Sequence, residues 1–250
     1  MVDFHTHILP RIDDGATDET TSLQMLNIAL KQGIIDVVLT PHYYGKESVQ
    51  DFLQKRQESF AKIQKDIPSG ITAHLGVEVH FNGRNVYHFD SLKALTIEGT
   101  RYILIEFPFT EHWSSALIQK LFAFMEQTDC IPILAHIERY TEIKKNPQLV
   151  STLVQAGCLI QVNAGSFVNK KDKRLAFALL RNGLVHCIGS DAHNVGNRVS
   201  EYDKAKDSVI KMGFEKEWNN IQDTMKNILQ DEPIFVTEIG KVKKIFGFYL

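Results

Sequence analysis

Two histidines separated by one residue, His5 and His7, stand at the start of the chain, and Asp191 and His193 repeat this spacing near its end. In an extended strand the side chains alternate between two faces, so residues i and i+2 point the same way. Each pair can therefore present two ligands to one point in space. Neutral imidazole and carboxylate groups are what a divalent metal ion needs from a protein. The pattern indicates a metal-dependent hydrolase.

Short runs of β-branched and aliphatic residues alternate along the chain with segments of helical character. We predict a first helix that Thr17 or Asp18 caps and that Gly33 ends. The other predicted helices cover residues 51–66, 114–128, 147–156 and 172–182. The predicted strands cover residues 2–5, 36–40, 71–79, 102–107, 131–136, 159–163 and 185–189.

Strand followed by helix, repeated seven times, predicts an α/β fold with a parallel sheet and crossover helices. Seven such units would close into a distorted TIM-like (β/α)7 barrel, one unit short of the common eightfold type, although an open sheet is the alternative. The sequence has no internal repeat, no low-complexity segment and no obvious linker, so we predict a single domain over residues 1–250.

Polar residues able to bind metal stand at the carboxyl end of nearly every predicted strand. In parallel α/β folds the loops at these ends converge, and active sites gather there. A barrel that places a His, Glu or Asp at successive strand ends has built a ring of ligands. The residues of this ring are His5, His7, His42, Glu78, Glu106, His136, Asn163, Asp191 and His193.

The overall composition is that of an ordinary globular protein, with 44% hydrophobic and 23% charged residues. A formal charge of −2 gives no general reason to bind nucleic acid or an anionic membrane. No apolar run approaches the ~18 residues that span a bilayer, and the first residues do not resemble a secretory signal. Together with three widely spaced cysteines, these features favour a cytoplasmic protein without disulfides.

A cysteine-dependent phosphatase would need an Arg six positions after its nucleophile. The residues six positions after Cys130, Cys158 and Cys187 are His136, Ala164 and His193. This spacing excludes cysteine-based phosphatase chemistry.

The ligand-bearing motifs carry a family resemblance over residues Val2 to about Arg198. They include His5-Thr6-His7, Ile12-Asp13-Asp14-Gly15-Ala16, Thr40-Pro41-His42, Gly76-Val77-Glu78, His136-Ile137-Glu138-Arg139-Tyr140 and Ser190-Asp191-Ala192-His193. The chain resembles the PHP (polymerase and histidinol phosphatase) superfamily. It is most similar there to the bacterial manganese-dependent tyrosine-protein phosphatases encoded with capsule and exopolysaccharide genes. One departure is Tyr43, where relatives often carry a second His after the residue that matches His42.

The resemblance implies a PHP-type barrel with three divalent metal ions. Mn²⁺ is the metal expected from the family, although other divalent ions also fit. By position, the first ion would take His5, His7, Glu78 and Asp191, and the second Glu78, Glu106 and His136. The third would take Asp14, His42 and His193, with Asp13 as an alternative to Asp14.

The resemblance also implies hydrolysis of phosphotyrosine by a metal-bound hydroxide, without a covalent intermediate. Arg139 and Arg198 follow ligand-bearing strands, and a guanidinium suits bidentate contact with phosphate. We expect both to bind the phosphate. His42 or Asp14 is a candidate general acid only where it is not fully committed to a metal ion. The implied partner is a phosphotyrosine protein, the tail of a bacterial tyrosine autokinase that controls polysaccharide export.

For several residues, both a functional and a structural role remain open. His80 repeats the i, i+2 spacing with Glu78, and Asn163 either orients a ligand or satisfies a strand end. We expect structural roles for His74, His88, His112 and His186. The basic and aromatic segment 241–250 either docks a partner or packs on its own domain as a helix or tail.

Two other classes of function compete with a tyrosine phosphatase. One is a small-molecule phosphatase, such as one for histidinol phosphate, or a phosphodiesterase. The other is a non-catalytic metal-binding regulatory domain. An open site would favour phosphotyrosyl peptides, a deep pocket would favour a small molecule, and the absence of manganese-stimulated hydrolysis would favour the regulatory domain.

Overall fold

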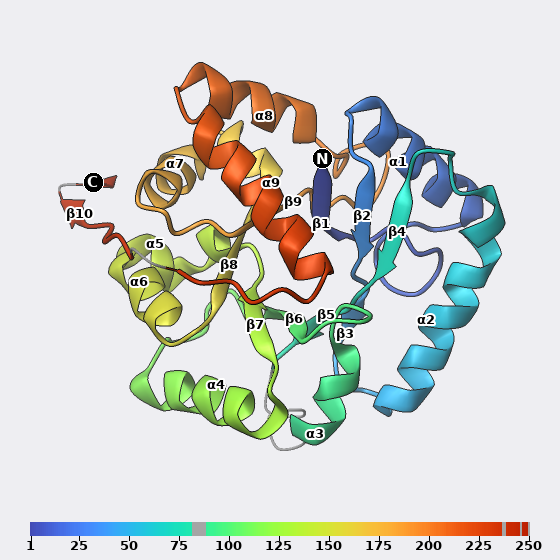
Figure 1. The fold of residues 1–250 in the computed structure, drawn as a ribbon, viewed down its shortest axis with the longest axis horizontal. Coiled ribbons are helices and arrows are strands. Elements are labelled where there is room, and N and C mark those ends of the chain that lie inside the picture. The colour runs from blue at the N-terminus through green and yellow to red at the C-terminus, as the bar shows by residue number, and fades with distance from the viewer. Residues whose placement is uncertain (82–88, 237–238, 246, 250) are drawn as a thin grey trace.

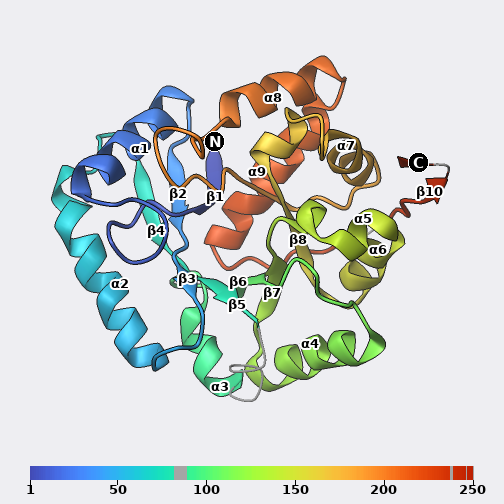
Figure 2. The same ribbon diagram turned by 180° about the vertical axis from the view of Figure 1, so that it is seen from behind.

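Parallel strands form the centre of the molecule, and helices cover its outside (Figures 1 and 2). The computed structural model describes residues 1–81, 89–236, 239–245 and 247–249. A three-stranded sheet has the order β1-β2-β4, and a six-stranded sheet has the order β3-β5-β6-β7-β8-β9. These strands are β1 (Val2–Thr6), β2 (Asp36–Leu39), β3 (His42–Tyr43), β4 (Thr72–Leu75), β5 (Glu78–His80), β6 (Tyr102–Glu106), β7 (Ile131–Leu134), β8 (Leu159–Asn163) and β9 (Cys187–Gly189).

The two sheets form one barrel because β2 and β4 continue, after short breaks, into β3 and β5. Pairing persists across the breaks, since the Gly76 N–H donates to the Leu39 carbonyl over 2.9 Å. On the other side β9 returns to β1, where the Asp191 N–H donates to the His5 carbonyl over 2.8 Å. If β2 and β3 count as one strand and β4 and β5 as another, the strands described here form a barrel of seven strands in sequence order. The predicted distorted (β/α)7 barrel is confirmed.

The prediction of one strand over residues 71–79 is wrong, because the chain forms β4 and β5 in two different sheets. The break falls at Gly76, where a side chain would lie 3.1 Å from Val38 Cγ1 and 3.2 Å from Thr40 Cγ2. The matching break between β2 and β3 contains Pro41, which has no N–H to donate to a ladder. These breaks distort the barrel beside the ligand-bearing residues.

The helices are α1 (Glu19–Lys31), α2 (Val49–Ile63), α3 (Phe89–Leu92), α4 (Ser115–Thr128), α5 (Thr141–Lys145), α6 (Gln148–Gln155), α7 (Lys173–Arg181), α8 (Tyr202–Lys211) and α9 (Glu215–Leu229). Of the two predicted caps of α1, Asp18 is the one that acts, since its Oδ1 accepts from the Thr21 N–H over 2.7 Å. Short 3-10 turns lie at Gln64–Asp66, Lys93–Leu95, Ile137–Arg139 and Ala164–Phe167. The helices predicted from the sequence all form, with ends shifted by a few residues.

Helices α8 and α9 are not among the predicted elements. Helix α9 crosses β1 and β9 (Figure 1), and two of its side chains bond to backbone groups there. Gln222 Oε1 accepts from the Val2 N–H over 2.8 Å, and Met225 Sδ accepts from the Ile188 N–H over 3.3 Å. The helix therefore fixes the two strands that bring the ends of the chain together.

The cysteines and the helix lengths bear on two expectations drawn from the sequence. Cys130, Cys158 and Cys187 are buried and unpaired, as expected for a chain without disulfides. Among the helices that the structure describes, none has the length and apolar character needed to cross a membrane.

The end of the chain packs on its own domain, but as a hairpin rather than the expected helix or tail. Strands β10 (Lys244–Ile245) and β11 (Phe248–Tyr249) pair antiparallel. The Lys244 ammonium and the Tyr249 hydroxyl both donate to the Lys144 carbonyl, over 2.7 and 3.0 Å. Residues 246 and 250 of the segment lie outside the described residues.

Gly189 ends β9 where β1 approaches most closely. A Cβ there would lie 2.4 Å from His5 Cβ and 2.9 Å from the His5 backbone nitrogen. We predict that Gly189→Ala lowers the free energy of unfolding by about 1–3 kcal/mol, because the strands must separate. Urea denaturation measures this loss. Gly196→Ala is the control, since its Cβ would meet nothing closer than 3.6 Å. Equal stability of the two variants would contradict the close-contact argument.

Candidate metal centre

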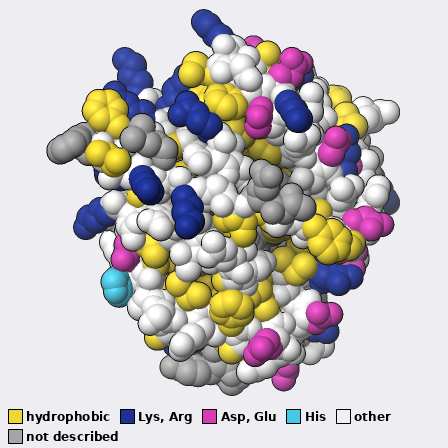
Figure 3. Space-filling view, turned by 60° about the vertical axis from the view of Figure 1, so that its left-hand side comes forward, with side chains coloured by type: hydrophobic (Ala, Val, Ile, Leu, Met, Phe, Trp, Pro, Cys, Tyr) yellow, Lys and Arg dark blue, Asp and Glu magenta, His cyan; other side chains and the backbone are white. Residues whose placement is uncertain are grey.

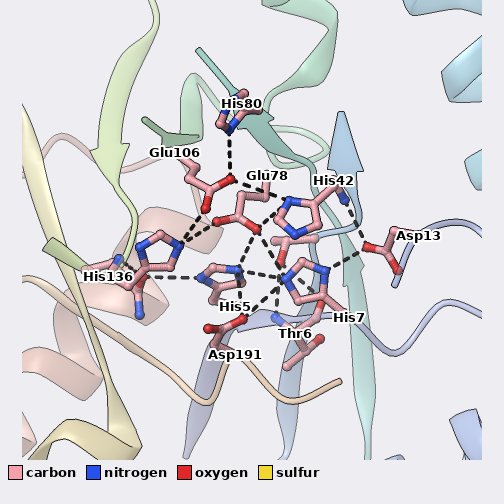
Figure 4. Close-up of polar contacts among 12 residues, drawn as sticks. His5, Thr6, His7, Asp13, His42, Glu78, His80, Glu106, His136 and Asp191 are labelled. Atoms are coloured by element: carbon pink, nitrogen blue, oxygen red, sulfur yellow. Dashed lines mark hydrogen bonds and ion pairs between the residues drawn. The ribbon is translucent and has the colours of Figure 1, made fainter. Parts of the chain in front are cut away.

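The ring of ligands predicted from strand ends converges at one end of the barrel (Figure 4). His5 and His7 lie on and just after β1 and point to the same side, as the alternation of side chains along a strand requires. Between them, Thr6 points away, and its hydroxyl donates to the Val38 carbonyl over 2.8 Å. Their two Nε2 atoms are only 3.1 Å apart in a fully buried position.

Glu78, the first residue of β5, lies at the centre of the cluster. Its Oε2 is 3.1 Å from His5 Nε2, 3.2 Å from His7 Nε2 and 3.0 Å from His42 Nδ1. Its Oε1 is 3.0 Å from His136 Nε2. One buried carboxylate therefore contacts four imidazoles that come from three different segments of the barrel, since His5 and His7 both belong to the end of β1.

Two further carboxylates close the cluster on either side of Glu78. Glu106 Oε1, at the end of β6, is 3.5 Å from His136 Nε2. Asp191 Oδ1, after β9, is 3.5 Å from His7 Nε2 and 3.9 Å from His5 Nε2. The carboxylates and imidazoles thus alternate, which is the arrangement that holds neighbouring cations.

The orientation of the histidines fits bound metal ions. Three of them bond outward through Nδ1: His5 to Gln161 Oε1 over 3.3 Å, His7 to Asp13 Oδ2 over 2.7 Å, and His193 to the Asp191 carbonyl over 2.9 Å. Such bonds fix the tautomer of a metal-binding imidazole and leave Nε2 as a ligand. His193 Nε2 is buried and has no hydrogen-bond partner among the residues that the structure describes. Buried polar atoms of this kind require an ion or another partner.

Three overlapping groups of side chains have ligand atoms within 4.8 Å of one another. The first is His5, His7 and Glu78; the second is His42, Glu78 and Glu106; the third is His7, Asp14, His42 and His193. They overlap the three ligand sets expected from the family resemblance. They differ in leaving out Asp191 and His136, in placing His42 with the two glutamates, and in adding His7 to the third group. His136 Nε2 nevertheless lies 3.0 Å from Glu78 Oε1 and 3.5 Å from Glu106 Oε1.

Asp13 and Asp14 have different environments. Asp13 is buried and accepts from His7 Nδ1 and, over 3.0 Å, from the His42 backbone N–H. Asp14 is 59% exposed, with its Oδ1 3.6 Å from His42 Nε2 and 3.4 Å from His193 Nε2. Asp13 therefore orients the His7 ring through Nδ1, on the side away from the cluster. Asp14 faces the cluster itself.

The cluster attracts positive charge strongly. Burial by itself lowers the pKa of His7, but hydrogen bonds and charge from Asp13 and Glu78 outweigh it and raise that pKa to about 10. Burial by itself raises the pKa of Glu78, but the charge of His5 and a hydrogen bond to His136 hold it well below its usual range. Burial lowers the pKa of His193 to about 4, so this imidazole is neutral at pH 7 and available as a ligand.

Arg139 and Arg198 both reach Asp191. Arg139 Nη1 is 2.9 Å from Asp191 Oδ2, and Arg198 Nη2 is 3.3 Å from Asp191 Oδ1. Arg198 also contacts Asp14 Oδ2 over 3.2 Å. Their side chains are 36% and 39% exposed and line a polar cleft of about 250 Å³ beside the cluster. This cleft offers cationic donors next to the cluster of imidazoles and carboxylates.

Two half-exposed aromatic rings flank the cluster. The Tyr44 ring lies 5.0 Å from the His42 ring. The Phe109 ring lies 5.4 Å from the His136 ring and 4.5 Å from the Arg139 guanidinium. Sequence reasoning did not single out either residue. The sequence offered little indication of their role, because aromatic residues are common in loops and only the fold shows which side chains lie beside them.

Two residues with open interpretations lie at the site. His80 Nδ1 is 3.0 Å from Glu106 Oε2, and Asn163 Nδ2 donates to Asp191 Oδ2 over 2.9 Å. Both therefore orient carboxylates of the cluster. Gln161 was missed: its Oε1 accepts from His5 Nδ1 and, over 2.6 Å, from the His136 N–H. Its position two residues before Asn163 on β8 was the available signal.

The histidines expected to be structural lie away from the cluster where the structure describes them. His74 pairs with Asp36 over 3.0 Å, and His112 pairs with Glu142 over 2.9 Å. The buried His186 accepts from the Ile160 N–H over 3.1 Å. His88 lies outside the described residues.

A distorted barrel with this ring of ligands defines the class of PHP-type metal-dependent hydrolases. A family model described as "Capsular polysaccharide synthesis, CpsB/CapC" matches residues 1–230. The chain belongs to this family, which confirms the resemblance found in its motifs.

The similarity to individual proteins supports this family assignment. The chain is 34% identical to tyrosine-protein phosphatase YwqE of Bacillus subtilis over 264 residues, covering 100% of both proteins. It is 28% identical to tyrosine-protein phosphatase CpsB of Streptococcus pneumoniae, covering 94% of this chain and 100% of that one. A crystal structure from work on YwqE and CpsB, described as unique metal-dependent tyrosine phosphatases, matches with a TM-score of 0.83. That match has 31% identity and covers 98% of this chain and 100% of the other.

The position of Asp13 behind His7 generates a prediction about metal affinity. Asp13→Asn keeps an acceptor for His7 Nδ1 but removes the charge, so we expect Mn²⁺ affinity to fall about 10- to 100-fold. Isothermal titration with Mn²⁺ measures the change. Asp18→Asn makes the same chemical change at the cap of α1 and is the control. Unchanged Mn²⁺ affinity in Asp13→Asn would mean that this carboxylate does not support a ligand.

Proposed function

We propose that this protein hydrolyses phosphotyrosine in proteins with the help of three divalent metal ions, Mn²⁺ among the candidates. The observation that carries the proposal is the buried cluster around Glu78, with two arginines meeting at Asp191 beside it. The relatives named tyrosine-protein phosphatases support the substrate class. We also propose that residues 1–250 form one domain that works in the cytoplasm.

The ligands of the ions would be those expected from the sequence. They are His5, His7, Asp14, His42, Glu78, Glu106, His136, Asp191 and His193. The contacts described above support all nine, and all but Asp14 and His42 are buried. When bound, divalent ions neutralise phosphate charge and make water acidic enough to supply hydroxide near neutral pH.

The arginines would bind the phosphate oxygens. Arg139 and Arg198 are partly exposed, so each can turn from Asp191 toward a phosphate in the adjacent cleft. A guanidinium makes paired hydrogen bonds with phosphate. The phenol of tyrosine has a pKa of about 10, so its departure needs little help from a general acid. His42 remains the nearest candidate for that help, since its Nε2 faces Asp14 and its side chain is 10% exposed.

The exposure of the site favours a protein substrate over a small molecule such as histidinol phosphate. Tyr44 and Phe109 are each 38% exposed, and Asp14 is 59% exposed. A phosphotyrosine on a flexible segment can reach such a surface site, whereas a small substrate gains most from an enclosing pocket. The capsule family supports a bacterial tyrosine autokinase as the partner, with its phosphorylated tail as the substrate.

A comparison of substrates tests the proposed function. With Mn²⁺ present, we expect kcat/KM for a phosphotyrosyl peptide to exceed the values for the matched phosphoseryl peptide and for histidinol phosphate. His136→Ala and Asp191→Ala should abolish hydrolysis and keep the circular dichroism spectrum of the fold. Faster hydrolysis of histidinol phosphate would contradict the proposal, and activity without any divalent ion would contradict the role of the cluster.

Phe109 gives a second prediction, since its ring covers Arg139 at the edge of the cluster. Stacking of two aromatic rings contributes roughly 0.5–1.5 kcal/mol. We therefore expect Phe109→Ala to lower kcat/KM for p-nitrophenyl phosphate by about 2- to 10-fold. Hydrolysis of glycerol phosphate, which has no ring, should fall less. Phe235→Ala is the control, because this residue is 81% exposed and lies outside the site. Equal losses on both substrates would show that Phe109 does not recognise the aryl group.

A further inference from the structure

A second cleft, of about 350 Å³, lies between helix α7, the end of helix α8 and the C-terminal hairpin. Its apolar lining includes Phe248 and Met212, which are 59% and 52% exposed. Large apolar groups that stay on the surface at one place mark an interaction site more often than a random surface. The lining residues are Lys173, Arg174, Phe177, Ala178, Arg181, Met212, Phe248 and Tyr249.

The charged residues of this lining are all basic. Lys173 donates to the Ser208 hydroxyl over 3.0 Å, a neutral partner. Arg174 lies 5.7 Å from the Phe248 ring, and Arg181 lies 5.9 Å from the Phe214 ring. Within the ranges that the structure describes, neither arginine forms an ion pair. Figure 3 shows this side of the molecule, where Lys and Arg side chains gather around exposed apolar ones.

The cleft is connected to the catalytic side of the barrel through Lys144 on α5. The Lys144 carbonyl accepts both hydrogen bonds that hold the hairpin, and its ammonium lies 2.7 Å from Asp172 Oδ1. Asp172 lines the phosphate-side cleft that contains Arg139 and Arg198, and the next residue, Lys173, lines the hairpin cleft. The two clefts are therefore lined by consecutive residues of the chain at their shared border.

We infer that the hairpin cleft is an accessory docking site for an acidic segment of the substrate protein that also carries an aromatic or aliphatic residue. Carboxylates of that segment would pair with Arg174 and Arg181, and its apolar side chain would pack on Phe248 and Met212. This inference rests on the proposed phosphatase function and adds a substrate class to it. A flat anionic membrane fits less well, because the cations surround a hollow that suits individual side chains.

Docking outside the reaction centre should act on substrate binding and leave the chemistry unchanged. The test variant is Arg174→Glu/Arg181→Glu. Its matched control is Lys62→Glu/Lys65→Glu, a double charge reversal at exposed positions of α2 and the turn after it. The substrates are p-nitrophenyl phosphate, a short phosphotyrosyl peptide, and long phosphotyrosyl peptides with a Glu- and Phe-containing segment on either side of the phosphotyrosine.

We expect the test variant to raise KM for at least one long acidic peptide by about 5- to 20-fold, with kcat unchanged. Its kinetics on p-nitrophenyl phosphate and on the short peptide should match those of the unmodified protein. Phe248→Ser should raise the same KM in part, without reversing any charge. The control variant should keep the original KM for every substrate.

Three results would overturn the inference while leaving the proposed function intact. One is the same KM in test and control variants for the long acidic peptides. A second is an equal loss on p-nitrophenyl phosphate, which would indicate damage to the fold. The third is loss of binding to phosphatidylserine vesicles in the test variant without any change in peptide kinetics, which would assign the cleft to a membrane. If no substrate is hydrolysed by the unmodified protein, the proposed function fails instead.

Discussion

Buried carboxylates that face one another across a few ångströms are the constraint on which the rest of this structure depends. Glu78 and Asp191 are almost completely removed from water, and an isolated buried anion is very costly. Imidazoles from several strands surround them, yet within the described part of the chain the buried His193 Nε2 has no hydrogen-bond partner. Such a concentration of lone pairs is stable only if positive charge lies among them. The cluster therefore determines what the fold must bring together and what it must bind.

The irregular features of the barrel bring these side chains together. Breaks at Pro41 and Gly76 divide two strands just before His42 and Glu78, so that both side chains reach the cluster. Gly189 lets β9 approach β1 closely enough to bring Asp191 beside His5 and His7. Asp191 itself has a positive φ of 53°, an uncommon conformation for a residue other than glycine. Both strand breaks and the positive φ of Asp191 thus lie where the clustered side chains meet.

The convergence of these side chains could be predicted from the sequence because parallel strands place their carboxyl ends together. The i, i+2 pairs His5/His7 and Asp191/His193 needed only the alternation of a strand, and the structure brings all of the predicted ligands to one cluster. The strand break at Gly76 could not be predicted in this way, because it depends on contact with Val38 and Thr40 from a neighbouring strand. Local patterns contain no information about such contacts.

Other features were missed for different reasons. Helix α9 has apolar residues at helical spacing, Trp218, Ile221, Met225 and Ile228, so its sequence signal was present. The separate environments of Asp13 and Asp14 could not be read from two adjacent, identical residues. Only the fold decides which carboxylate supports His7 and which one faces His193.

Diffraction from crystals soaked in Mn²⁺, recorded near the manganese absorption edge, tests the central claim most directly. The account predicts anomalous peaks inside the cluster, within coordination distance of His5, Glu78, His136, Asp191 and His193. Anomalous density confined to surface carboxylates, or its absence from fully soaked crystals, would contradict the claim that these buried groups exist to hold metal ions.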